Sequence, residues 1–123
     1  MLIVRAFGTL DRVQLTQETG SGGAIRLVVS GEIDMSTAQE VRDAGIAAVT
    51  APDVSGLDVD LSGVTFLDST GLGALVAVRT AGGDLSRAVR IGAASPRVRQ
   101  VIEVCGLTSE FGLDATGSVA ATD

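Results

Sequence analysis

The sequence predicts one α/β domain built on a mixed β-sheet, with an N-terminal antiparallel hairpin and helices packed mainly on one face. Two observations support this fold class. Stretches in which every second residue is apolar alternate with stretches of helical period, a pattern typical of parallel strands joined by helices. The length of 123 residues suits a single hydrophobic core. We expect the domain at residues 1–112 and a flexible tail at residues 113–123.

The predicted hairpin occupies the first quarter of the chain. Residues 13–16 alternate apolar and polar side chains, which indicates a strand that runs through residue 18. Three glycines within residues 19–23 favour a turn, because glycine adopts backbone angles closed to other residues. Residues 25–30 carry apolar side chains at every second position and are predicted to form the second strand, which ends at residues 31–34.

A first helix is predicted from Ser36 and Thr37 onward. Either residue can start a capping box, Ser36 with Gln39 or Thr37 with Glu40. The helix carries a narrow stripe of small apolar residues, which favours close packing against a sheet. The members of this stripe are Ala38, Val41, Gly45, Ala48 and Val49.

A strictly alternating strand follows at residues 57–61. Its carboxylates Asp58 and Asp60 share one face, so we expect a solvated face of the sheet there and interpret the pair as surface residues rather than as a metal site. Residues 62–63 predict a turn, and residues 64–67 run extended toward the start of a second helix.

A short strand at residues 89–91 precedes a third helix. Ser95 is predicted to be its N-cap, Pro96 its first residue, and Gly106 its C-terminal cap. Its apolar positions follow the helical spacing i, i+3, i+4 and i+7. They are Val98, Val101, Ile102 and Cys105. We therefore expect Cys105 to be a core residue and not a redox switch.

Composition excludes most catalytic chemistry. The chain has no histidine, lysine, tryptophan or tyrosine, and a single cysteine. This removes histidine general-base catalysis, the serine and cysteine nucleophiles that need a histidine, Schiff-base chemistry and phosphate loops that carry a lysine. A zinc site made of cysteine and histidine ligands is also excluded. We expect no enzymatic activity, no metal and no cofactor.

The charge balance leaves two interpretations open: attraction of a basic protein partner, or a negative charge that only keeps the domain soluble. A formal net charge of −6 disfavours binding to nucleic acid and to anionic membranes. A protein with a basic face would instead be attracted electrostatically. No apolar run approaches the length needed to span a bilayer, and the first residues lack the features of a secretory signal, so a cytoplasmic protein is expected.

The segment most informative about function is Asp68 to Gly73, which joins a strand to the second predicted helix. Free backbone N–H groups and the positive end of the helix dipole make such a start favourable for an anion, including a phosphate carried by a serine. The two glycines of the segment let another backbone approach closely. Asp68, Ser69 and Thr70 are also good N-cap residues, and a structural cap alone would account for them.

Three motifs together resemble the STAS family. They are Gly31-Glu32-Ile33-Asp34, the run from Leu57 to Gly73, and Ser95-Pro96-Arg97-Val98-Arg99 with Cys105-Gly106-Leu107. They occur in the family's order and span about Val13 to Phe111, and the run from Leu57 to Gly73 is the most specific. The likeness is greatest to bacterial stand-alone anti-sigma factor antagonists.

The resemblance implies the STAS fold and a partner-switching function. The unphosphorylated antagonist would bind an anti-sigma factor that is also a serine kinase, and so release a sigma factor. The kinase would phosphorylate the serine that follows the motif's aspartate, here Ser69, which switches binding off, and a PP2C-type phosphatase would reset the cycle. A weak homodimer is left open. The implied partner-binding residues are Asp34, Asp68, Ser69, Thr70, Gly71 and Leu72.

Two of these residues have a second interpretation. Asp34 is implied as a partner contact, but it could equally cap the first helix. Thr70 stands where the family often has a second serine, and we interpret it as a contact or cap and as a minor phosphorylation candidate.

Two other functions remain as alternatives. One is a STAS subunit of another assembly, either a stressosome-like scaffold or the partner of a lipid transporter, and the presence of Ser69 argues against the transporter class. The other is a small nucleotide-binding STAS domain with its anion site at the helix start near Gly71. The absence of lysine and of a long glycine-rich loop argues against tight nucleotide binding.

Overall fold

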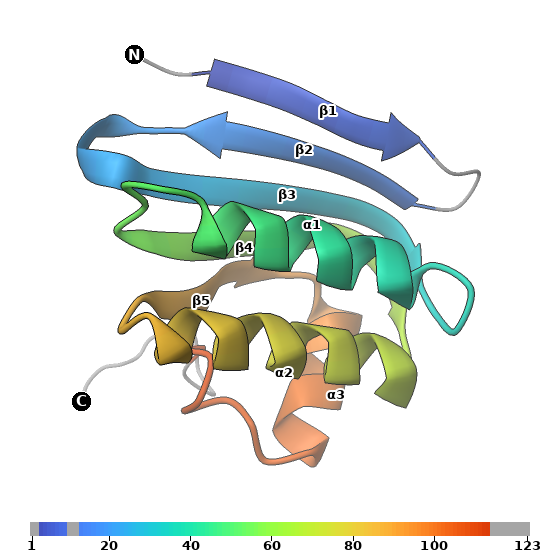
Figure 1. Cartoon of the computed structure of the whole chain (residues 1–123). Coiled ribbons are helices and arrows are strands. Elements are labelled where there is room, and N and C mark those ends of the chain that lie inside the picture. The colour runs from blue at the N-terminus through green and yellow to red at the C-terminus, as the bar shows by residue number, and fades with distance from the viewer. Residues whose placement is uncertain (1–2, 10–12, 114–123) are drawn as a thin grey trace.

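The computed structural model describes residues 3–9 and 13–113, which form a five-stranded mixed sheet and three helices (Figure 1). The strands lie in chain order and are β1 (Ile3–Thr9), β2 (Val13–Thr19), β3 (Ala24–Ile33), β4 (Gly56–Leu67) and β5 (Ala88–Ala94). The first three strands are antiparallel, whereas β3, β4 and β5 are parallel. The predicted fold class, an α/β domain with a mixed sheet, is confirmed.

The predicted hairpin is formed by β2 and β3. A short 3-10 turn at Ser21–Gly23 joins the two strands, and Gly22 and Gly23 have φ angles of 70° and 81°. These angles explain the glycine-rich turn. One element differs from the expectation of a single strand through residue 18, because β1 is a separate strand paired with β2. Its residues do not alternate strictly, so the sequence pattern did not separate it from β2.

Helices α1 (Ala38–Thr50) and α2 (Ser69–Asp84) lie side by side over one face of the sheet (Figure 1). The predicted stripe of small residues permits this close approach, since a Cβ on Gly45 would lie 2.5 Å from the side chain of Val78 in α2. Sheet residues that are almost completely buried are Leu15, Leu27, Val29, Val59, Leu61 and Ile91. Among the described residues, no helix has both the length and the apolar character needed to cross a membrane.

Strand β4 continues through the turn predicted at residues 62–63. Asp60 Oδ1 accepts hydrogen bonds from the N–H and the hydroxyl of Ser62, at 2.9 and 2.6 Å. The pairing with β3 shifts register here, and Gly63 lies opposite Ser30, where a Cβ would be 2.9 Å from the Cβ of Ser30. The predicted turn is therefore wrong: this point is an irregularity within one long strand. It carries β4 onward to Leu67, at the edge of the sheet that holds the candidate site.

The face of β4 away from α1 and α2 is polar, as the alternation predicted. Asp60 forms an ion pair of 2.7 Å with Arg26 of β3. Burial raises the pKa of Asp60, but hydrogen bonds from Ser62 and the interaction with Arg26 outweigh it, so the pKa is lowered overall. Asp58 lies against Gly92 of β5, where any added Cβ would meet its carboxylate. These contacts give Asp60 a structural role, whereas Asp58 Oδ1 is buried without a hydrogen-bond partner among the described residues.

Helix α3 (Pro96–Val104) begins as predicted and contacts β4 and β5. Ser95 is its N-cap, and the Ser95 hydroxyl accepts a hydrogen bond of 3.4 Å from the N–H of Val98. The same hydroxyl donates to the carbonyl of Val64 at 2.7 Å. One side chain thus caps α3 and ties it to β4.

The prediction that Cys105 is a core residue is wrong. Val98 and Ile102 are buried as expected, but Cys105 is exposed. The helix ends at Val104, and the chain turns at Gly106, whose φ of 73° confirms the predicted C-terminal cap. Cys105 therefore lies beyond the last residue that α3 presses against the sheet.

The domain extends one residue beyond its predicted boundary. Leu113, the expected first residue of the tail, is buried, and its N–H donates to the carbonyl of Thr108 at 2.8 Å. Phe111 is also buried, and its carbonyl accepts a hydrogen bond of 2.9 Å from the N–H of Ile91 in β5. The rest of the predicted tail, residues 114–123, lies outside the described residues.

Candidate functional site

The segments that follow β3 and β4 meet at one edge of the sheet because these strands are parallel neighbours. Asp34 follows β3, and Asp68 follows β4. The N–H of Asp68 donates to the carbonyl of Ile33 at 3.3 Å, which holds the two segments together. Both aspartates line a hollow of about 440 Å³. The fold therefore brings Asp34 beside the residues that start α2.

A compact set of hydrogen bonds holds the segment after β3. Asp34 Oδ1 accepts from the N–H and the hydroxyl of Ser36, each at 2.9 Å. The buried Thr37 hydroxyl donates to the carbonyl of Glu32 at 2.7 Å and accepts from the N–H of Asp34 at 2.9 Å. The predicted capping box is therefore wrong. Thr37 occupies the N-cap position of α1 without a side-chain cap bond, because its hydroxyl fastens the turn to β3.

Asp68 is the N-cap of α2. Its Oδ1 accepts a hydrogen bond of 2.9 Å from the N–H of Gly71, and its carbonyl accepts one of 2.9 Å from the N–H of Leu72. The structural interpretation of the segment is thus confirmed for this residue. A free anion at the same place would meet a carboxylate that already satisfies one of the exposed donors. This argues against the nucleotide-binding alternative.

Ser69 and Thr70 are the first two residues of α2, and both are exposed. Because Asp68 serves as the cap, their hydroxyls are not needed to satisfy the helix start. A side chain at this position can be modified without unpairing a backbone group. The structure therefore assigns capping to Asp68 and leaves Ser69 accessible on a rigid element.

Gly71 and Leu72 face inward. Leu72 is buried, and a Cβ on Gly71 would lie 2.8 Å from the carbonyl oxygen of Ile33 and 2.7 Å from the side chain of Leu67. The backbone that approaches Gly71 thus belongs to β3 of the same domain. These two residues seat α2 against the sheet, and their contact with a partner stays a prediction. Gly73 differs, since it is exposed and has open space where a Cβ would lie.

Two exposed apolar side chains lie at the site, and the sequence patterns did not single them out. Met35 is 80% exposed and Phe66 is 37% exposed, and both line the hollow between Asp34 and Asp68. Large apolar side chains that gather at the surface mark interaction sites. Met35 had a visible signal, because it stands between two polar loop residues. Phe66 had none, because its exposure depends on the irregularity in β4.

A second hollow, of about 340 Å³, lies between α1 and α2 and shares Met35 with the first. Thr70 and Gly73 line it from α2, and Arg42 lines it from α1. The area around Ser69 thus combines carboxylates, apolar side chains and an arginine. We call this area the Ser69 surface and define it by Asp34, Met35, Arg42, Phe66, Asp68, Ser69, Thr70 and Gly73.

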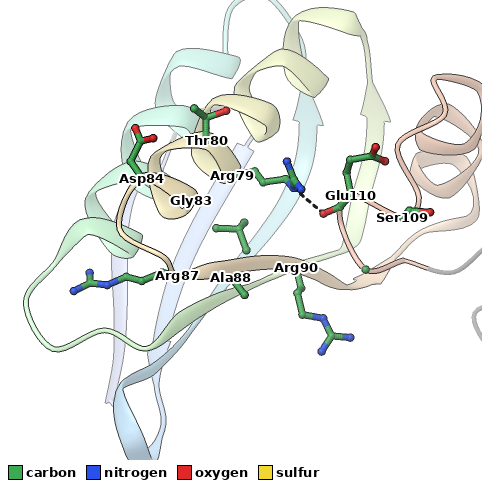
Figure 2. A pocket seen from close by; sticks show the side chains of 11 residues that line it. Arg79, Thr80, Gly83, Asp84, Arg87, Ala88, Arg90, Ser109 and Glu110 are labelled. Carbon is green, nitrogen blue, oxygen red and sulfur yellow. Dashed lines mark hydrogen bonds between the residues drawn. The ribbon is translucent and has the colours of Figure 1, made fainter.

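Another hollow, of about 520 Å³, lies at the far end of α2 (Figure 2). Arg79 Nε donates to the carbonyl of Glu110 at 2.8 Å, and Arg87 Nη1 donates to two carbonyls at the C-terminal end of α1, each at 2.7 Å. These arginines fasten chain segments to one another. Figure 2 shows Arg79, Arg87 and Arg90 pointing in different directions, so their guanidinium groups do not converge on one ligand.

The sheet order, helices α1 and α2 on one face and the exposed hydroxyls at the start of α2 define an α/β domain of the STAS type. A family model described as "Mlab, STAS domain" matches residues 16–113. The chain belongs to the STAS domain family, as the three sequence motifs implied.

Similar proteins include several anti-sigma factor antagonists. The anti-sigma-F factor antagonist RsfB of Mycobacterium tuberculosis is 35% identical over 108 residues, which cover 86% of this chain and 84% of RsfB. The crystal structure of an anti-sigma factor antagonist from Mycobacterium paratuberculosis has a TM-score of 0.72 and 35% identity, covering 85% of this chain and 87% of that one. Unphosphorylated SpoIIAA has a TM-score of 0.67 and 19% identity, covering 89% of each chain, and this likeness shows the fold alone.

Proposed function

We propose that this chain is an anti-sigma factor antagonist whose Ser69 surface binds an anti-sigma factor. The observation that carries the proposal is the exposed Ser69 on the first turn of α2, beside the exposed side chains of Met35 and Phe66. The 35% identity to RsfB over 84% of its length supports this assignment. The domain acts in the cytoplasm by binding and release rather than by catalysis, in keeping with its lack of histidine and lysine.

The partner is an anti-sigma factor that is also a serine kinase, and Ser69 is its substrate. Phosphorylation adds about 1.5 to 2 negative charges directly after Asp68. The amino-terminal end of α2 tolerates this charge, so the domain stays folded. A packed interface does not tolerate it, because the phosphate adds bulk and lies close to the carboxylates of Asp34 and Asp68. A loss of about 4 kcal/mol weakens binding roughly a thousandfold.

Release of the phosphate closes the cycle. A PP2C-type phosphatase removes it from Ser69, and the unmodified antagonist binds the kinase again. The exposure of Ser69 and Thr70 supports access by both enzymes. Thr70 serves as a contact at the interface and as a minor acceptor of phosphate.

The assignment of Ser69 is tested by incubating the chain with purified kinase anti-sigma factors and ATP, followed by localisation of phosphate by mass spectrometry. We expect phosphate mainly on Ser69, and in the Ser69→Ala variant only a small amount, on Thr70. Ser55→Ala is a matched control, because Ser55 is exposed and precedes β4, whereas Ser69 follows that strand. It should be phosphorylated like the wild type. Phosphate found only at Thr70 or elsewhere would refute the assignment.

A second candidate is a STAS subunit of another assembly, either a stressosome-like scaffold or a lipid-transporter partner. The family model that matches this chain is described as "Mlab, STAS domain". The second candidate is therefore tested together with the first. The two candidates differ in their partners. The proposed antagonist should bind a kinase anti-sigma factor when ADP replaces ATP, because Ser69 then stays unphosphorylated. Failure to bind every such kinase of the genome would favour the second candidate.

A further inference from the structure

A third hollow at this end of the sheet lies on the α3 side of β4, beside the Ser69 surface. It has a volume of about 320 Å³, and Leu67, Val101 and Val104 form its apolar walls together with Cys105. Val104 is 80% exposed, and Cys105 is also exposed. Val104 does not anchor α3 in the core, because the buried residues of this helix are Val98 and Ile102.

The exposed large apolar side chains of the described residues are not scattered evenly. There are five of them: Met35, Phe66, Val76, Leu85 and Val104. Met35, Phe66 and Val104 line hollows whose walls also contain the consecutive residues 66–68. Phe66 and Asp68 belong to the first hollow, and Leu67 belongs to the third. The end of β4 is therefore a ridge with an exposed apolar group on either side.

An ordinary interface is large enough to cover both sides of this ridge. A stable protein complex buries about 800 Å² on each partner, which is a round footprint of about 16 Å radius. Leu67 is two residues from Ser69, so at most about 7 Å of extended chain separates them. A partner centred on Ser69 is therefore large enough to extend over the third hollow, whose walls include exposed apolar side chains.

We propose that the anti-sigma factor bound at the Ser69 surface also places an apolar side chain in the hollow formed by Leu67, Val101 and Val104, and covers Cys105. This inference rests on the proposed function and identifies a second anchor of the same interface. Contacts at the end of α3 lie away from the phosphorylated serine, so they set the affinity and the choice of partner rather than the switch.

The first test compares two matched substitutions. Val104→Asp places a charge in the hollow, whereas Leu85→Asp places one at an exposed apolar residue just past the opposite end of α2. Both side chains are exposed, so both variants should fold, which thermal melting checks. We expect Val104→Asp to weaken binding of the kinase anti-sigma factor in ADP at least tenfold, and Leu85→Asp to change it less than twofold.

The second test uses the wild-type chain and its single cysteine. Alkylation of Cys105 by iodoacetamide, followed by mass spectrometry, should slow at least fivefold when the kinase anti-sigma factor is bound. Equal alkylation rates in the free and bound chain, or equal affinities of the Val104 and Leu85 variants, would overturn the second anchor and leave the proposed function standing. Absence of binding by the wild type would overturn both.

Discussion

At the scale of single residues, Asp68 and Ser69 have separate tasks. The sequence offers three neighbouring residues that can cap α2, and local propensity does not choose among them. In the fold, Gly71 lies against Ile33, a residue far away in the sequence, and the N-cap is Asp68. Asp68 then accepts the hydrogen bond from Gly71, and Ser69 is left exposed. The sequence pattern could identify this segment, but it could not show that Asp68 caps the helix while Ser69 is exposed.

Asp60 gives a prediction about acid stability. Its lowered pKa means that it stabilises the fold above its ordinary value of 3.8, and that this contribution is lost as the pH falls through the lower pKa of the folded state. Asp60→Asn should therefore be less stable than the wild type at about pH 6, by up to about 1 kcal/mol, and the difference should shrink toward about pH 3. Urea unfolding at both pH values measures it. A difference that stays constant or grows in acid would contradict the assignment.

At the scale of elements, short sequence motifs correctly predicted the features that depend on contacts between residues close in sequence. The start of α3 at Ser95 and the β2–β3 hairpin follow from short-range chemistry, and both are present. The errors concern features set by neighbours in space. The irregularity at residues 62–63 depends on how β4 pairs with β3, and the exposure of Cys105 depends on where α3 leaves the sheet. The spacing of apolar residues along the sequence predicts neither of these two features.

The contact between α2 and β3 can be tested with two glycines of the same helix. Gly71→Ala places a Cβ against the backbone carbonyl of Ile33, which cannot move away freely, so we expect a loss of about 1–3 kcal/mol in the free energy of unfolding. Gly73→Ala places its Cβ in open space and should stabilise the helix by up to about 1 kcal/mol. Urea unfolding of the two variants should therefore give effects of opposite sign. If Gly71→Ala were as stable as Gly73→Ala, the seating of α2 on β3 would be wrong.

At the scale of the whole molecule, the fold class and family could be predicted because strands and helices alternate and three motifs occur in order. The convergence of Asp34 and Asp68 follows from the parallel pairing of β3 and β4. The apolar part of the site could not be predicted in the same way. The exposure of Phe66 depends on the irregularity in β4, and Val104 is exposed as the last residue of α3. The exposed apolar side chains of the proposed interface therefore depend on how the strands and helices are arranged in the fold.

The central claim is that one phosphate on Ser69 decides whether the antagonist binds. The most direct measurement is calorimetric titration of the kinase anti-sigma factor in ADP with four forms: the unphosphorylated chain, the fully phosphorylated chain, Ser69→Ala and Ser69→Asp. We predict that the unphosphorylated chain and Ser69→Ala bind with similar affinity, and that the phosphorylated chain and a Ser69→Asp variant bind roughly a thousandfold and at least tenfold more weakly, respectively. Equal affinities of the phosphorylated and unphosphorylated chains would contradict the account.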